Sequence, residues 1–169
     1  MRSSADAVRV EDTFSLAAFF LGDGLYGIDI MKIKEVIHAA PYPVRHVPHA
    51  PVMIEGVIEV RGVVIPVMDL RARFGLGATE MSRDRAKFIV VSVDGRILAL
   101  RVDRIVGEVR VERESVRPSP ALLEGAVSQR ERFFEGVTRV DEQLMFVLDL
   151  VGLTALPSGG VSSGEGHGS

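Results

Sequence analysis

The stretch GVIEVRGVVIPVMDLRARFG, Gly56 to Gly75, decides how the rest of the chain is interpreted. It opens with alternating apolar and polar residues, and this pattern predicts a strand, a tight turn at Arg61-Gly62, a second strand and a short helical segment after Asp69. Eighty residues later (136 − 56 = 80) the chain repeats the pattern without a gap as GVTRVDEQLMFVLDL, Gly136 to Leu150. The sequence therefore predicts two copies of one β unit.

A second repeated element precedes each copy of that stretch. The segment TFSLAAFFLGDGLYGIDI, starting at Thr13, predicts a hairpin at Gly22-Asp23-Gly24, because Asp-Gly supplies the positive φ of a tight turn. The segment AKFIVVSVDGRILALRVDRIVGEV, starting at Ala86, repeats it with Asp94-Gly95 at the turn. Each copy then holds about five short strands, the natural size of a small closed barrel. We expect an all-β protein with a few short helices, built as two five-stranded barrels in tandem.

The ends of the chain differ in composition from its middle. Residues 1–12 show little periodicity and are expected to form a flexible arm, and residues 157–169, PSGGVSSGEGHGS, are too rich in Gly and Ser to pack. Between them we expect one domain, residues 13–156. Its first lobe should cover about residues 13–78 and its second about residues 84–145, while residues 146–156 should pack where the lobes meet.

Composition excludes several classes of function. The 169 residues are 47% hydrophobic and carry 20 Lys and Arg against 23 Asp and Glu, so there is no positive charge excess to attract nucleic acid. There is no Cys, which excludes disulfides and thiolate metal sites and fits a reducing compartment. No apolar run approaches the length needed to cross a bilayer, and we expect a cytoplasmic protein without membrane insertion.

Two sets of residues raise the possibility of catalysis or metal binding. Asp69 and Asp149 occupy matching places in the repeats, as the acid pair of an aspartic protease would, but each is followed by Leu and is more simply a helix cap. His38, His46 and His49 lie in or beside a proline-rich loop, residues 38–51, where nothing orients them as zinc ligands. We expect no catalytic residues, no metal and no cofactor, with a β-barrel enzyme using the two aspartates as the alternative.

Three charged residues stand out on otherwise apolar strands. Glu35, Glu59 and Arg61 interrupt segments that are rich in β-branched residues. Each alone is explained by solvent exposure next to a turn. Together, with no catalytic set nearby, they indicate a surface that binds other proteins, because small barrels expose edge strands and grooves where a β surface or an amphipathic helix can dock.

These motifs resemble the CheW family of chemotaxis coupling proteins. The resemblance rests on LGDGLYGIDIMKIKEVI, Leu21 to Ile37, and VPHAPVMIEGVIEVRGVVIPVMDLRARFG, Val47 to Gly75, with weaker echoes in the second half, and it covers nearly everything from Thr13 to Leu156. It implies a CheW-like domain of two SH3-like barrels around a shared core, without enzymatic activity. It also implies a scaffold that links the cytoplasmic tips of methyl-accepting chemoreceptors to the regulatory domain of the histidine kinase CheA, in arrays recruited to the membrane.

The resemblance also suggests roles for five residues. Arg61 and Glu35 match the family's characteristic charged positions, which implies a receptor-binding or array-organising surface in which Glu35 holds Arg61 in place. Ile33, Val36 and Gly56 match positions associated with kinase binding, where an apolar patch and a residue without a side chain allow two β surfaces to approach closely.

The chain departs from the family pattern at one point of this surface. The family commonly has Asn-Leu-Arg-Gly where this chain has Glu59-Val60-Arg61-Gly62, and the added carboxylate changes the charge beside the arginine. The partner range therefore stays open, and an adaptor for a chemosensory pathway with an output other than flagella is the nearest alternative.

Overall fold

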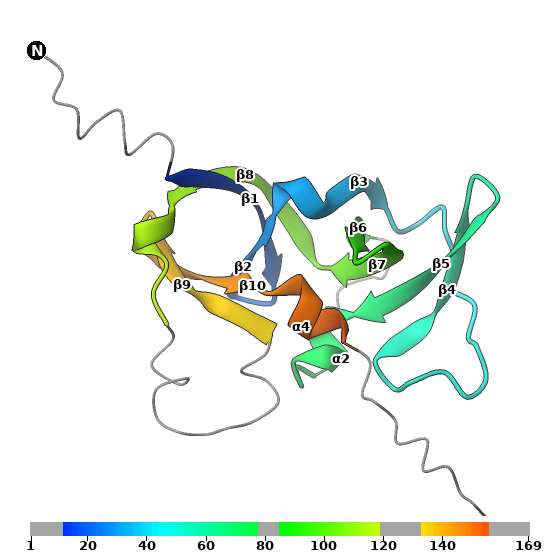
Figure 1. Cartoon of the computed structure of the whole chain (residues 1–169). Helices are drawn as coiled ribbons and strands as arrows, with labels where there is room; N and C mark the ends of the chain where they lie inside the picture. The colour runs from blue at the N-terminus through cyan, green and yellow to red at the C-terminus, as the bar shows by residue number, and fades with distance from the viewer. Residues whose placement is uncertain (1–11, 78–84, 119–132, 156–169) are drawn as a thin grey trace, which may run out of the picture.

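The computed structural model describes residues 12–77, 85–118 and 133–155. These residues form two five-stranded sheets and four short helical segments (Figure 1). The predicted mostly-β fold with short helices is confirmed. The expected arm and tail lie outside the described residues.

Each sheet curls into a small barrel. Barrel A has the strand order β8 (Arg104–Glu112), β1 (Thr13–Leu21), β2 (Gly24–Asp29), β10 (Gln143–Leu148), β9 (Phe134–Val140). Barrel B has the order β3 (Ile33–His38), β6 (Lys87–Val93), β7 (Arg96–Val102), β5 (Val63–Asp69), β4 (Ile54–Val60). One isolated antiparallel bridge links the two edges of each sheet, Arg117 with Val137 in barrel A and Arg45 with Val57 in barrel B. The open outline of barrel A is clear in Figure 1.

The barrels do not follow the order of the repeats along the chain. The hairpin β1–β2 of the first copy lies in barrel A between strands of the second copy, and the hairpin β6–β7 of the second copy lies in barrel B between strands of the first. The expected lobes, residues 13–78 and 84–145, therefore differ from the barrels. Parallel pairing of β2 with β10 and of β7 with β5 holds each hairpin in the barrel of the other copy.

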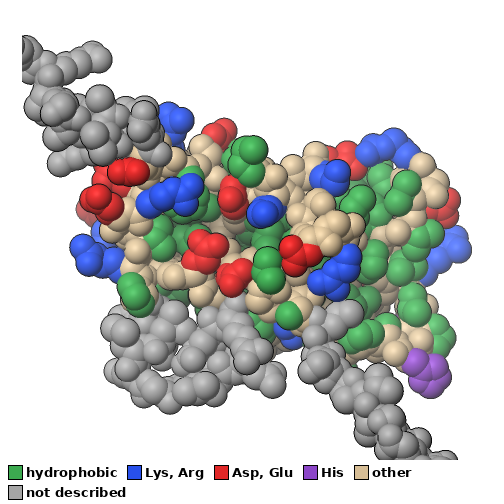
Figure 2. Space-filling view, in the orientation of Figure 1, with side chains coloured by type: hydrophobic (Ala, Val, Ile, Leu, Met, Phe, Trp, Pro, Cys, Tyr) green, Lys and Arg blue, Asp and Glu red, His purple; other side chains and the backbone are tan. Residues whose placement is uncertain are grey.

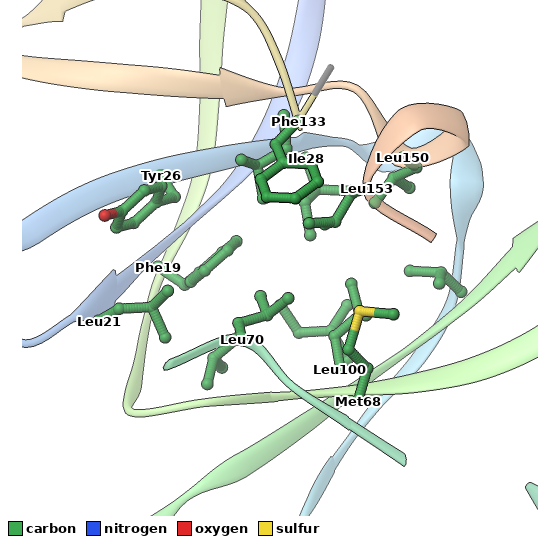
Figure 3. Packing of buried hydrophobic residues seen from close by; sticks show 14 of the residues in the cluster. Phe19, Leu21, Tyr26, Ile28, Met68, Leu70, Leu100, Phe133, Leu150 and Leu153 are labelled. Carbon is green, nitrogen blue, oxygen red and sulfur yellow. The ribbon is translucent and has the colours of Figure 1, made fainter. Parts of the chain in front are cut away.

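This exchange produces three apolar clusters. One lies inside barrel B, one lies inside barrel A, and the third and largest joins the two barrels. Strand β6 contributes side chains to two of these clusters. Phe88 and Val90 face the interior of barrel B, while Ile89 and Val91 face the shared cluster. A strand that is buried on both faces has an almost continuous run of apolar residues, as in KFIVVSV. Figure 3 shows the shared cluster, with side chains from both barrels pointing toward one another.

Short helical segments connect the strands. The 3-10 turns η1 (Ile30–Lys32) and η3 (Arg113–Ser115) precede β3 and follow β8, and the helices α2 (Leu70–Arg73) and α4 (Leu150–Thr154) follow β5 and β10. Leu70, Leu150 and Leu153 are buried in the shared cluster, so both helices cover the junction of the barrels. No helix in the described part of the chain is long and apolar enough to cross a membrane.

Candidate functional site

The turn between β4 and β5 fixes the position of Arg61. Arg61 and Gly62 have φ values of 49° and 82°, and a two-residue hairpin with positive φ at both positions matches the right-handed twist of its strands. A non-glycine residue at positive φ is uncommon, so the backbone at Arg61 is held by the register of the two strands rather than by its own preference. The turn presents the guanidinium at the end of the hairpin.

Glu35 on β3 binds this guanidinium. Nη2 of Arg61 lies 2.5 Å from Oε1 of Glu35, and 70% of the Arg61 side chain and 30% of the Glu35 side chain are exposed. The prediction that Glu35 holds Arg61 is confirmed. An exposed ion pair contributes only about 0–1 kcal/mol to stability. Its main effect is therefore to orient the guanidinium across the edge of barrel B.

Exposed apolar residues are neighbours of the ion pair along β3 and β5. Val36 on β3 and Val63 and Val64 on β5 are 45%, 52% and 62% exposed. Arg61 and Val64 also line a hollow of ≈ 360 Å³, together with Glu59 and others. In the view of Figure 2, apolar side chains gather over β4 and β5, whereas acidic side chains gather over the middle of the face. A charged pair inside an exposed apolar patch is the composition of a protein interface.

Ile33 and Gly56 are less exposed than these valines. Ile33 is half-buried and packs against the shared cluster. Gly56 is buried in β4, where a Cβ atom would stand 2.2 Å from the carbonyl oxygen of Arg45 and 2.8 Å from Cγ1 of Val44. The glycine does permit a close approach, as the sequence suggested, but the backbone that approaches belongs to this chain. Gly56 therefore closes barrel B, and its part in kinase binding stays a prediction.

The two matching aspartates are helix caps. Oδ1 of Asp69 accepts a hydrogen bond from the backbone N–H of Arg71 at 3.0 Å, and Oδ1 of Asp149 accepts from those of Val151 and Gly152 at 3.1 and 3.3 Å. The capping interpretation is confirmed, and it accounts for Asp at both positions of the repeat.

The histidines are not brought together into a metal site. Nδ1 of His38 lies 2.6 Å from Nζ of Lys87, a cation that competes with any metal there. His49 has a φ of 62° and lies in the exposed proline-rich loop. Among the residues that the structure describes, no group of three or more His, Asp or Glu is placed to hold a metal ion.

Sequence reasoning missed the polar contact that links the two barrels. Oδ2 of Asp103, between β7 and β8, accepts from the backbone N–H of Gly22 and from Nη1 of Arg71, each at 2.7 Å. Gly22 belongs to the β1–β2 turn of barrel A and Arg71 to α2, so one carboxylate joins three elements. These contacts gave no local signal, because Arg71 and Gly22 lie 32 and 81 residues from Asp103 along the chain.

A second missed contact lies within barrel B. Arg101 on β7 donates two hydrogen bonds to Glu55 on β4, Nε to Oε2 at 2.9 Å and Nη2 to Oε1 at 2.7 Å. A two-point arginine–carboxylate pair fixes both side chains in one plane. This pair ties the start of β4 to β7, on the other side of β5.

The geometry defines a twin-barrel protein-binding module whose distinctive surface is an oriented arginine within exposed valines. Comparison with known proteins agrees: residues 15–157 match the family model described as the CheW-like domain. The chain belongs to this family, as the sequence resemblance indicated.

Individual relatives match most of the chain. The chemotaxis protein CheW of Treponema pallidum (strain Nichols) is 34% identical over 143 residues, which are 83% of this chain and 81% of that protein. Chemotaxis protein CheW of Rhizobium meliloti (strain 1021) is 32% identical over 136 residues, 80% of this chain and 83% of that protein. The crystal structure of the scaffolding protein TtCheW from Thermoanaerobacter tengcongensis superposes with a TM-score of 0.74 at 30% identity, covering 85% of this chain and 89% of that one.

Proposed function

We propose that this protein is a non-enzymatic chemotaxis scaffold that couples methyl-accepting chemoreceptors to the histidine kinase CheA. Family membership and relatives named chemotaxis protein CheW support the role. The observation that connects this role with a particular site is the Glu35–Arg61 pair, which orients an exposed guanidinium near exposed valines. Such a surface offers apolar area for affinity and a fixed charge for orientation of the partner.

The kinase's regulatory domain is proposed to bind barrel B at the strands β3 and β4. Both β3 and β4 are edge strands of their sheet, and Val36 points outward from β3. Ile33 supports this surface from below, and Gly56 keeps β4 close to residues 44–45, so both act on the docking face through its shape. Edge strands with exposed apolar side chains suit the packing of one small barrel on another.

The receptor tip, a helical hairpin, is proposed to lie along the junction of the two barrels. Arg61, at the end of the β4–β5 hairpin, is proposed as the receptor-facing or array-organising residue, with Glu35 fixing its direction. One barrel surface for the kinase and a junction for the receptor would let a single chain hold both partners at once.

A titration tests both parts of the proposal. Isotopically labelled protein receives the CheA regulatory domain first and a receptor-tip peptide second, while backbone amide shifts are followed. We expect the kinase domain to shift amides of β3 around Ile33 and of β4 around Gly56, and the receptor peptide to shift a separate set that includes Arg61. If neither partner shifts any amide at high concentration, the coupling role is wrong.

Matched variants place the binding surface. Val36→Asp should weaken kinase binding at least about tenfold, because it puts a charge into an apolar contact. Arg61→Ala should weaken receptor binding or array assembly while leaving the circular dichroism spectrum unchanged. Arg139→Ala removes another exposed arginine, on β9 of barrel A, and serves as the control. Equal effects of Arg61→Ala and Arg139→Ala would contradict the assignment.

A further inference from the structure

The two barrels differ in the parallel ladder that holds the exchanged hairpin. In barrel A, Met145–Val147 of β10 pair with Leu25–Gly27 of β2. In barrel B, Val67–Asp69 of β5 pair with Ala99–Arg101 of β7. The repeat relates β10 to β5 by an offset of 80 residues (145 − 80 = 65) and β2 to β7 by an offset of 72 residues (25 + 72 = 97). After this conversion the two ladders have the same register, but the ladder of barrel A starts two residues earlier. Barrel B thus lacks the two pairs that would join residues 65–66 to residues 97–98.

The missing pairs have a cause in the sequence. Pro66 stands in β5 where barrel A has Phe146. Proline has no backbone N–H and cannot donate to a ladder, so within a sheet it disrupts pairing with the neighbouring strand. Phe146 pairs with Tyr26 in barrel A, whereas the ladder of β5 with β7 starts only at Val67, after Pro66.

A groove opens where the ladder is interrupted. It has a volume of ≈ 450 Å³ and is lined mainly by apolar residues, including Pro48, Ile54, Pro66, Met68, Ile97 and Leu98. Thr154 of α4 also lines it. The space is enough for several apolar side chains of a bound peptide.

The chemistry of the groove favours an extended, acidic occupant. Among its lining residues the ionisable groups are Arg96 and His49, and there is no carboxylate. Arg96 pairs with Val93 across the two-residue turn, so its backbone N–H and C=O face β6. Along an antiparallel pair the backbone groups of successive residues face alternate sides of the strand. The N–H and C=O of Ile97 therefore point away from β6, toward the side of β7 where the ladder with β5 has not begun.

We propose that this groove is a docking site for an extended apolar peptide segment of another protein that carries a carboxylate. The segment pairs as a strand with the free part of β7 at Ile97, places its apolar side chains against Pro66, Met68 and Leu98, and sets its carboxylate beside Arg96. Strand addition of this kind draws affinity from backbone hydrogen bonds and selectivity from side-chain pockets.

This groove is separate from the Glu35–Arg61 surface, although Met68 and Thr154 of α4 place part of it beside the junction of the barrels. None of Ile33, Glu35, Val36 or Arg61 lines the groove. The hollow beside Arg61 shares with it only Val57. A third partner can therefore bind while the Glu35–Arg61 surface is occupied.

The probe is a peptide whose sequence fills the equivalent position in barrel A. Acetyl-Met-Phe-Val-Leu-Asp-amide has the sequence of residues 145–149 and carries one carboxylate. Added to the labelled full-length protein, it is expected to shift the amides of Arg96, Ile97 and Leu98 and to slow hydrogen exchange at Ile97. A control peptide with Pro in place of Phe, the residue equivalent to Pro66, lacks the backbone donor that faces β7 and should bind at least about tenfold more weakly.

Variants of the protein test the mechanism. Pro66→Val restores a donor to β5 and is expected to extend the ladder, close the groove and reduce peptide binding at least about tenfold. Arg96→Gln should weaken binding of the Asp peptide about threefold to tenfold and leave an Asn version of the peptide unaffected. Leu144→Ser, which changes an exposed apolar residue of barrel A, should have no effect. Folding of each variant is checked by circular dichroism.

Four results would overturn the proposal. The first is no amide shift at Ile97 with millimolar peptide, and the second is equal binding to the parent and to folded Pro66→Val. The third is peptide binding only after removal of residues 156–169, which would make the chain's own end the occupant. The fourth is movement of the same amides with protein concentration alone, which would make a second copy the occupant.

Discussion

Barrels A and B place the same glutamate in opposite electrostatic surroundings. Glu55 of barrel B and Glu135 of barrel A are equivalent in the repeat (135 − 55 = 80), and so are Arg101 and Asp29 (101 − 29 = 72). Glu55 is held by the two hydrogen bonds from Arg101. In barrel A, burial raises the pKa of the Glu135 carboxyl, and the nearby Asp149 and Asp29 raise it further, while Arg113 opposes them.

This difference shows which interactions the barrel requires. Both barrels close with the same strand order although only one has the ion pair, so apolar packing and backbone pairing determine the fold. Charge is then free to diverge. The turns of the equivalent hairpins also differ in charge, because Arg61-Gly62 in barrel B stands where barrel A has Asp141-Glu142. Their backbones are alike, since the first residue of each turn has a positive φ, 49° and 47°. Each barrel thus offers a different surface to partners.

The largest expected effect tests whether the barrels are energetically separate. Leu100→Ala removes a fully buried side chain from the shared cluster and should lower the free energy of unfolding by about 3 kcal/mol. Because the largest apolar cluster contains side chains from both barrels, urea unfolding should remain a single transition, with amide signals of both barrels lost together. Val151→Ala, at an exposed site on α4, is the control. Two separate transitions would show that the shared cluster does not couple the barrels.

The next prediction concerns a feature that the barrels share. A Cβ at Gly56 would lie 2.2 Å from the carbonyl oxygen of Arg45, and one at Gly136 would lie 2.5 Å from that of Arg117. Gly56→Ala and Gly136→Ala should each destabilise the protein by about 2–3 kcal/mol, the former more, because backbone must move. Gly77→Ala meets nothing within 4 Å and should leave the urea midpoint unchanged. Equal midpoints for all three variants would mean that the closing bridges are loose.

Replacing the two equivalent glutamates should change the stability of the protein in opposite directions. Glu55→Gln leaves the half-buried Arg101 without its carboxylate and should destabilise the protein by about 1–2 kcal/mol. Glu135→Gln relieves repulsion from Asp29 and Asp149 and should stabilise it slightly at pH 7. Denaturant unfolding of both variants under identical conditions measures the contrast. A loss of stability in Glu135→Gln would show that favourable contacts of the Glu135 carboxylate outweigh its repulsion by Asp29 and Asp149.

The pH dependence of the Glu135 effect follows from its raised pKa. The folded state binds this proton more tightly than the unfolded state does, so the contribution is favourable below the unfolded pKa and is lost as pH rises through the higher folded pKa. The gain of Glu135→Gln over the parent should therefore be present at neutral pH and disappear in acid. Unfolding curves measured across the carboxyl range check this, and a gain that grows in acid would contradict it.

The smallest expected effect on stability is that of Arg61→Ala. Its ion pair with Glu35 is exposed to water, so the free energy of unfolding should change by less than about 1 kcal/mol. Urea midpoints of Arg61→Ala and Glu35→Ala should match the parent closely. A large loss would identify the pair as structural and weaken its assignment to binding.

Local features of the fold were readable from the sequence. The hairpin at Arg61-Gly62, the caps Asp69 and Asp149, and the pairing of Glu35 with Arg61 followed from turn chemistry, repeat position and family resemblance. These depend on short-range rules or on a long ordered match. The internal repeat likewise predicted two equivalent five-stranded units.

The exchange of hairpins was not readable from the sequence. Alternation and turn residues define where β2 and β7 begin and end, but they do not identify the strand on the far side. That choice depends on long-range parallel pairing with β10 and β5 and on burial of β6 on both faces. For the same reason the groove beside Pro66 and the contacts of Asp103 had no local signal. Each depends on elements that only the tertiary fold brings together.

The exchange also sets the order in which the protein can fold as it leaves the ribosome. Barrel B draws all its strands from residues 33–102 and can close once Val102 has emerged. Hairpin β1–β2 is made first but needs β8, β9 and β10, so it must wait until Leu148 is available. Nascent chains should therefore protect β3–β7 from proteolysis before β1 and β2. The part of the chain that is synthesised first is placed last, and its apolar face needs shielding in the interval.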